Sequence, residues 1–196
     1  MPAALRTHLL DGQVIPALPL ALGRTRRWDE RRQRAVVRYY ADAGAGGLAV
    51  GVHSTQFAIR DPRHGLFEPV LALAAAEARA WRGTGARGPF ALIAGLCGRT
   101  PQAVGEARTA AGLGYHAGLL SLGAWARDDE RAVLAHCRAV ARELPLVGFY
   151  LQPAVGGRVL SHAFWRRFAE IPEVVAIKVA PFHRYRTIDV VRAVLE

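Results

Sequence analysis

The fold is decided by the stretch Glu173-Val174-Val175-Ala176-Ile177-Lys178-Val179-Ala180, which holds the only lysine among the 26 basic residues of the chain. Lys178 stands in a run of β-branched and small apolar residues, which predicts a buried strand. A cation in such a strand is costly unless it is paired or loses its proton, and lysine can lose its proton where arginine cannot. One interpretation is a lysine at a strand end whose amine reaches water. The interpretation we favour is an amine that attacks a carbonyl.

Outward from this stretch, apolar runs alternate with helix-like segments along the chain. The expected strands cover residues 14–22, 48–52, 90–96, 116–122, 146–151 and 174–179, and the expected helices cover 28–43, 66–81, 101–112, 128–143, 161–171 and 187–196. The strands are apolar on both faces, which is typical of a parallel sheet covered by helices. No GxGxxG follows the first strand and no GxxxxGK[ST] occurs, so neither common nucleotide-binding motif is indicated.

The alternation favours an α/β fold of the (β/α)8 TIM-barrel type, of which the first six βα units are present. We expect a single (β/α) barrel domain over residues 1–196 that is incomplete at its C-terminal end. In such barrels the chemistry lies at the C-terminal ends of the strands. The side chains expected at or just after such ends are His53, Ser54, Thr55, Cys97, Trp125, Tyr150 and Lys178.

These strand ends carry no cluster of Asp, Glu and His and no carboxylate pair. We therefore expect no metal, no cofactor and no glycosidic chemistry. Of the seven histidines only His53 is well placed, and a lone histidine in a loop is more often a hydrogen-bonding residue than a catalyst.

Composition limits the other classes of function. The formal net charge is +10, but the arginines are spread along expected helices without a dense basic run, so we expect no nucleic-acid partner. No apolar run is long enough to span a bilayer, and the first residues lack the order of a signal peptide, so we expect no membrane partner. Two cysteines without a CxxC pair suggest a cytoplasmic location.

Two short segments resemble motifs of a known enzyme family. Phe149-Tyr150-Leu151-Gln152-Pro153 is similar to a Y-N-x-P motif, and Val175-Ala176-Ile177-Lys178 is similar to an I-G-I-K motif. With this strand placement and separation of Tyr150 and Lys178, the chain resembles the dihydrodipicolinate synthase / N-acetylneuraminate lyase family, whose members are class I pyruvate-type aldolases on a (β/α)8 barrel. The segment Gly51-Val52-His53-Ser54-Thr55-Gln56 stands in the place of the family's G-T-T-G-E loop.

The resemblance implies a mechanism without a cofactor. Lys178 would form an imine with pyruvate or a related 2-oxo acid, and Tyr150 would relay protons. A core tyrosine with a satisfied hydroxyl is the alternative for Tyr150. The substrate carboxylate would bind the loop, for which the candidates are Gly51, His53, Ser54 and Thr55. The partners implied are a small-molecule 2-oxo acid and an aldehyde, and a homo-oligomer is left open.

Three departures from the family pattern bear on specificity. The G-T-T-G-E loop is rewritten, and either Ser54-Thr55 or Val52-His53 replaces its two threonines. The second tyrosine of the family's proton relay is absent, since Leu122-Gly123-Ala124-Trp125 stands there. The arginine that binds the aldehyde's carboxylate in dihydrodipicolinate synthases is replaced by Val155, although Arg158 lies close by along the chain. We therefore expect a Schiff-base lyase or aldolase that does not make dihydrodipicolinate; the alternative is an inactive barrel remnant acting as a scaffold or binding module.

Overall fold

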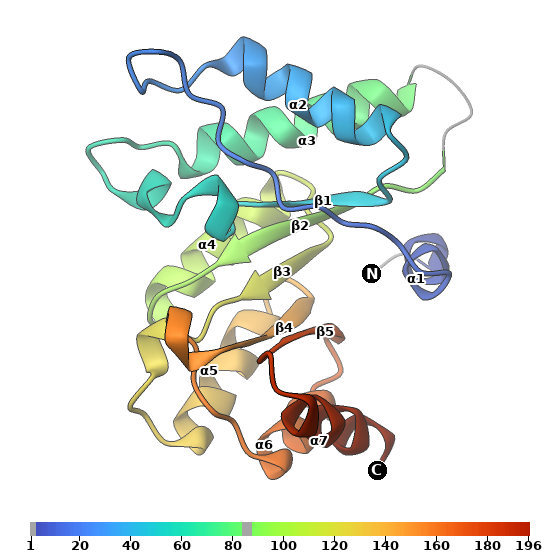
Figure 1. Ribbon diagram of the computed structural model, residues 1–196, viewed down its shortest axis with the longest axis vertical. Coiled ribbons are helices and arrows are strands. Elements are labelled where there is room, and N and C mark those ends of the chain that lie inside the picture. Colours follow the sequence, from blue (N-terminus) through green and yellow to red (C-terminus); the bar gives the residue numbers. More distant parts are fainter. Residues whose placement is uncertain (1–2, 84–87) are drawn as a thin grey trace. The chain divides into compact units, whose positions relative to one another are not determined.

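The computed structural model describes residues 3–83 and 88–196, in which strands and helices alternate (Figure 1). The strands are β1 (Gly47–Val50), β2 (Ala91–Leu96), β3 (Ala117–Leu120), β4 (Leu146–Leu151) and β5 (Val174–Ala180). The helices are α1 (Ala3–Leu10), α2 (Glu30–Asp42), α3 (Phe67–Gly83), α4 (Thr100–Gly112), α5 (Glu130–Ala141), α6 (His162–Ala169) and α7 (Arg184–Leu195). The α/β class is confirmed, and the parallel βα alternation is that of part of a TIM barrel.

The chain divides into two compact units, which are described separately. Unit 1 comprises residues 1–95 and 109–116, and unit 2 comprises residues 96–108 and 117–196. Within each unit the order of the strands follows their order in the sequence. Parallel neighbours in sequence order need a crossover connection, which the intervening helices supply.

In unit 1, β1 pairs in parallel with β2, with Gly47 opposite Ala91 and Val50 opposite Ala94. Every residue of both strands is buried, as their apolar sequences predict. Helices α2 and α3 are joined by ion pairs to Glu77, which is buried on α3. The guanidinium groups of Arg34 and Arg38 on α2 reach its two carboxylate oxygens at 2.6 and 2.7 Å. A buried carboxylate needs such partners because desolvation alone disfavours its charge.

The expected strand over residues 14–22 is wrong. This segment makes one isolated parallel bridge to β1, between Ala17 and Ala49. The Leu18 N–H donates to the Ala49 carbonyl at 2.8 Å, and the Ala49 N–H donates to the Pro16 carbonyl at 2.9 Å. On one side Pro16 has no N–H to donate. On the other side the Leu18 carbonyl accepts the Thr55 hydroxyl and the Gly51 N–H donates to Thr55 Oγ1, so the ladder does not continue. The segment follows β1 without becoming a strand.

Helix α1 (Ala3–Leu10) is a second difference, because the sequence analysis expects no helix before residue 28. Among its residues only Leu5 is buried. With one buried position there is no apolar stripe of the i, i+3, i+4 kind, and such a stripe is the main signal from which a surface helix is predicted.

Unit 2 contains the strands β3, β4 and β5 and an aromatic core between the sheet and α6. Tyr150, Phe164, Trp165 and Phe168 are each no more than 2% exposed, and neighbouring rings lie 5.0–6.0 Å apart between centroids. Gly148 on β4 makes room for this cluster, because a Cβ at that position would lie 2.7 Å from Phe168 Cε1. Helix α7 packs beside α6 and against β5 (Figure 1).

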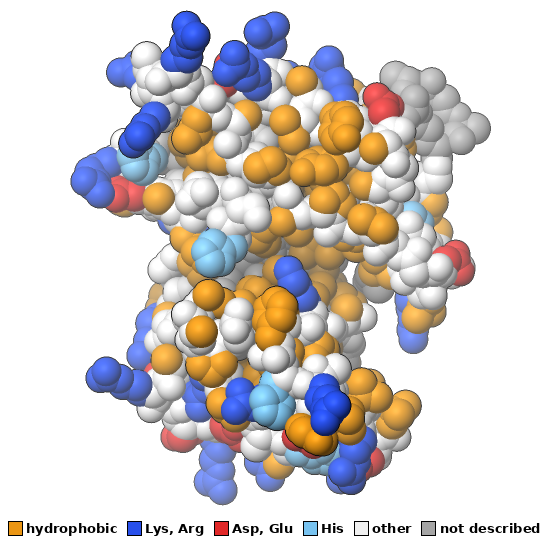
Figure 2. Space-filling view, in the orientation of Figure 1, with side chains coloured by type: hydrophobic (Ala, Val, Ile, Leu, Met, Phe, Trp, Pro, Cys, Tyr) orange, Lys and Arg blue, Asp and Glu red, His pale blue; other side chains and the backbone are white. Residues whose placement is uncertain are grey.

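On the face of the molecule that Figure 2 shows, basic side chains lie at several separate places. Figure 2 shows lysine and arginine scattered across the face in view, among acidic and apolar side chains, without one concentrated basic patch there. Across residues 3–83 and 88–196, none of the helices has both the length and the apolar character needed to cross a bilayer.

Candidate functional site

Lys178 lies on β5 directly opposite Phe149 of β4. Its Nζ is 5.0 Å from the centroid of the Phe149 ring, which is within the range of a cation–π contact. Both side chains therefore lie on the same face of the sheet. The expectation that β5 is buried is wrong, because its positions are half-buried or exposed and Lys178 itself is exposed. Among the described strands β5 pairs with β4 alone, so one of its edges has no neighbouring strand to cover it.

Tyr150 points to the other face of the sheet. Its register partner on β5 is Val179, one position beyond Lys178, and successive side chains of a strand alternate between the two faces. Tyr150 is 1% exposed and its ring lies 5.0 Å from that of Trp165. Its hydroxyl donates to the Leu160 carbonyl at 3.5 Å and accepts from the Leu160 N–H at 3.4 Å. The structure therefore places Phe149, and not Tyr150, beside the amine, which corrects the expected Tyr150–Lys178 pair.

The position of Tyr150 on the opposite face allows a test of its expected role as a proton relay. We expect Tyr150→Phe to leave any reaction of Lys178 within about threefold of wild type, because the lost hydroxyl lies on the opposite face. The two hydrogen bonds are long, so their loss should cost about 1 kcal/mol or less of unfolding free energy. Pyruvate turnover and urea unfolding of the variant measure both quantities. A rate loss of about 10²-fold or more, the usual effect of removing a general acid or base, would return Tyr150 to the proton relay.

Ser121 and Arg158 are two further polar residues near Phe149, and all three line one small hollow of unit 2. Ser121 directly follows β3 and is half-buried. Nη1 of Arg158 donates to the carbonyls of Trp125 and Asp128 at 2.6 and 2.7 Å. Arg158 is thus held by the backbone of the loop after β3. Ser121 is a polar residue near Phe149 that carries no signal in the sequence, because it is a lone serine after a strand.

In the loop of unit 1 that follows β1, some polar side chains form hydrogen bonds within the protein and others face solvent. The Thr55 hydroxyl, which is fully buried, donates to the Leu18 carbonyl at 2.6 Å and accepts from the Gly51 N–H at 3.1 Å. Gly51 has a φ of 76°, a conformation that favours glycine. Ser54 and His53 are exposed. Of the predicted carboxylate-binding residues, Ser54 therefore has the hydroxyl that is accessible.

Arg60 organises the same loop, and the sequence analysis missed it. Its guanidinium donates to the Gly51 carbonyl at 3.0 Å and to the Gly95 carbonyl at 2.8 Å. It also lies over the rings of Phe57 and Phe67, at 5.6 and 4.5 Å from their centroids. These contacts tie the ends of β1 and β2 together within unit 1, so Arg60 positions the loop.

Cys97, which follows β2, is half-buried beside an acidic side chain of unit 2. Its N–H donates to Glu106 Oε2 at 3.1 Å, and its thiol lies 3.9 Å from Oε1 of the same carboxylate. The Gln102 amide donates to that Oε1 at 2.9 Å. Among the described residues, His, Cys, Asp and Glu side chains form no group of three that could hold a metal ion.

His136 of α5 is a buried histidine in unit 2, with 2% exposure. Its Nδ1 lies 3.0 Å from the Thr100 hydroxyl, and its ring stacks on Trp125 with centroids 4.6 Å apart. Nε2 has no hydrogen-bond partner among the described residues. Burial, together with the nearby Arg99 charge, lowers the pKa of His136 to about 4. The neutral imidazole is therefore the form that the fold accommodates.

Because the pKa of His136 is lowered, we expect the folded protein to lose stability as the pH falls. Below pH 6.5 the unfolded chain binds a proton that the folded chain excludes until about pH 4. Stability is therefore complete above pH 6.5 and falls as the pH drops toward 4, by at most about 3 kcal/mol. Urea unfolding at pH 7 and pH 4.5 should show a smaller acid loss in His136→Gln than in wild type. Equal losses in the two proteins would contradict this assignment.

Known proteins resemble this chain in structure but not detectably in sequence. No protein-family model matches the chain, and no curated protein matches it by sequence. Solved structures do match. Dihydrodipicolinate synthase from Cyanidioschyzon merolae with lysine bound superposes with a TM-score of 0.80 at 20% identity, over 93% of this chain and 60% of that one. The chloride-inhibited dihydrodipicolinate synthase from Acinetobacter baumannii complexed with pyruvate gives 0.78 at 21% identity, over 93% and 60%.

A third match is CdNal from Clostridium difficile in complex with mannosamine, with a TM-score of 0.76 at 17% identity over 89% of this chain and 58% of that one. The chain thus has the fold of the dihydrodipicolinate synthase / N-acetylneuraminate lyase family, as the sequence motifs predict. It spans about 60% of the length of these structures.

Proposed function

We propose that the protein is a Schiff-base-forming lyase or aldolase that acts on pyruvate or a related 2-oxo acid through Lys178. The observation that carries the proposal is the position of the single lysine on β5, in a fold whose solved examples include two complexes with pyruvate. An amine at this place can attack a ketone, whereas an arginine cannot.

The proposed reaction needs no cofactor, because lysine, substrate and water supply all of its atoms. Nζ of neutral Lys178 adds to C2 of the 2-oxo acid to give a carbinolamine, which loses water to form the imine. Loss of a proton from C3 then gives an enamine, whose carbon adds to an aldehyde; retro-aldol cleavage is the reverse.

Proton transfer at the amine is assigned to solvent and to Ser121 rather than to Tyr150. Ser121 shares its hollow with Phe149, the residue beside Lys178, while Tyr150 is enclosed against Trp165. Dihydrodipicolinate synthesis is not the proposed reaction, because Val155 has no charge with which to bind an aldehyde carboxylate and Arg158 is bonded to backbone carbonyls.

The exposure of Lys178 favours a second candidate, an inactive barrel remnant that serves as a scaffold. An exposed amine is not enclosed in a site that excludes water from the reaction. Deuterium exchange separates the two candidates. An imine–enamine cycle replaces the methyl hydrogens of pyruvate with deuterium in D₂O, and proton NMR follows their loss. Exchange faster than in a protein-free control supports the enzyme, and exchange at the control rate supports the scaffold.

A further inference from the structure

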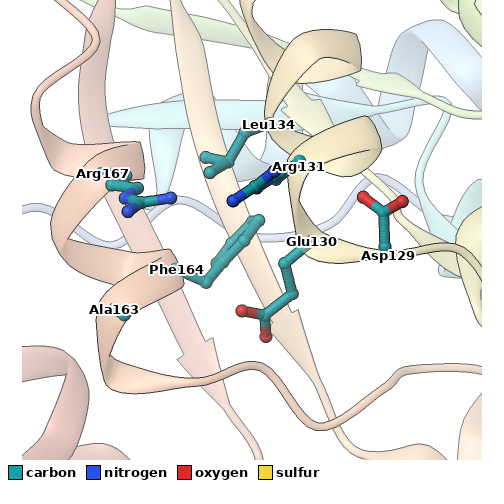
Figure 3. Close-up of a pocket in the computed structure, with 7 residues that line it drawn as sticks. All are labelled: Asp129, Glu130, Arg131, Leu134, Ala163, Phe164 and Arg167. Carbon is teal, nitrogen blue, oxygen red and sulfur yellow. The ribbon is translucent and has the colours of Figure 1, made fainter.

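A hollow on the outer surface of unit 2, between α5 and α6, is not explained by the chemistry at Lys178. It has a volume of about 420 Å³ and is open to solvent on one side. Arg131 and Leu134 line it from α5, and Phe164 and Arg167 line it from α6 (Figure 3). Phe164 and Leu134 are buried and give the hollow an apolar floor, whereas the two arginines are exposed at its walls.

The two acidic side chains at the rim, Asp129 and Glu130, are already engaged. The Asp129 carboxylate accepts the N–H of Ala132 at 2.8 Å and caps the start of α5. The Glu130 carboxylate accepts both the N–H and the hydroxyl of Ser161 at 2.8 and 2.6 Å, at the start of α6. Each carboxylate is therefore held at the start of a helix, where the helix dipole favours a negative charge. Among the described residues, neither carboxylate forms an ion pair with Arg131 or Arg167.

The arginines lack such partners. Figure 3 shows the Arg131 and Arg167 side chains reaching toward each other across the hollow. Among the described residues, neither guanidinium forms an ion pair or a side-chain hydrogen bond. Two like charges that face each other repel, and an anion bound between them would turn that repulsion into attraction.

We propose that the hollow between α5 and α6 binds a small organic phosphate. Two guanidinium groups match the charge of about −2 and the several oxygens of a phosphate monoester better than the single charge of a monocarboxylate. The floor of Leu134 and Phe164 accepts an apolar part of the ligand, and the volume of the hollow exceeds what inorganic phosphate alone would fill. The site lies on the helices and does not depend on the reaction proposed for Lys178.

Calorimetric titration of the whole protein with phenyl phosphate tests the site. We expect saturable binding at one site, weakened about tenfold to hundredfold by Arg131→Gln and by Arg167→Gln, since each removes a charge-assisted contact. Arg138→Gln is the matched control, because it removes an exposed arginine of the same helix that does not line the hollow. Inorganic phosphate should bind more weakly than phenyl phosphate. Circular dichroism of each variant checks that the fold is intact.

Three results would overturn the proposal. Binding that is unchanged in both Arg131→Gln and Arg167→Gln would place the anion elsewhere. Equal weakening by Arg138→Gln would mean that the overall positive charge attracts phosphate without a site. Tighter binding of phthalate than of phenyl phosphate would assign the hollow to dicarboxylates instead.

Discussion

Lys178→Arg is expected to reduce the exchange of pyruvate methyl hydrogens to the rate of the protein-free control. The substitution keeps a long basic side chain beside the Phe149 ring, but the guanidinium cannot form the imine. Because Lys178 is exposed on β5, the replacement should leave stability within about 0.5 kcal/mol of wild type. Proton NMR of pyruvate in D₂O measures the exchange, and urea unfolding measures the stability.

The double variant Lys178→Arg with Arg166→Lys is the matched control. It also contains one lysine, now on the exposed surface of α6. If any exposed lysine suffices, this variant restores exchange and the position of Lys178 has no special role. The account predicts that exchange stays at the control rate. Wild-type exchange in Lys178→Arg alone would refute the assignment directly.

Trp165→Ala should destabilise unit 2 by about 3–5 kcal/mol. The indole is 1% exposed and packs against Tyr150, Phe164 and Phe168, so its removal leaves a large cavity in the core. A loss of this size is a large part of the stability of an ordinary domain. Chemical denaturation followed by circular dichroism gives the value. A loss below about 1 kcal/mol would mean that this aromatic cluster does not form the core.

Trp165→Phe is the control for this prediction and should cost much less. Nε1 of Trp165 is buried without a hydrogen-bond partner among the described residues. An unpaired buried N–H itself costs about 1–3 kcal/mol, and phenylalanine removes it together with part of the ring. The two effects oppose each other, so the phenylalanine variant should lie much closer to wild type than the alanine variant.

Much of the fold was predictable because its strands are short apolar runs between helices with clear caps. The bounds of β4 (Leu146–Leu151) agree with the expected strand, and Asp129 and Ser161 cap α5 and α6 through their side chains. The strand predicted over residues 14–22 is wrong because apolar composition alone suggested it, whereas Pro16 has no N–H to donate and the Leu18 carbonyl accepts the Thr55 hydroxyl. An apolar sequence predicts that a segment is buried, but it does not predict which hydrogen bonds the backbone of that segment forms.

The site was less predictable than the fold, for two physical reasons. Phe149 and Tyr150 are both large aromatic residues in a strand that is apolar on both faces, so the sequence does not show which of them faces Lys178. A register shift between β4 and β5 near Val147 settles the question in favour of Phe149. The burial of Lys178 depends on what covers β5, and a strand's own sequence does not specify its neighbours.

The most direct test of the central claim is trapping of the imine. Pyruvate and sodium borohydride are added to the whole protein, and the intact mass and the modified peptide are measured. We expect one reduced pyruvate adduct on the peptide that contains Lys178, absent without borohydride and absent in Lys178→Arg. The single lysine makes the result simple to interpret, because the α-amino group of the chain is the other primary amine. No adduct, or an adduct on the α-amino group alone, would contradict the account.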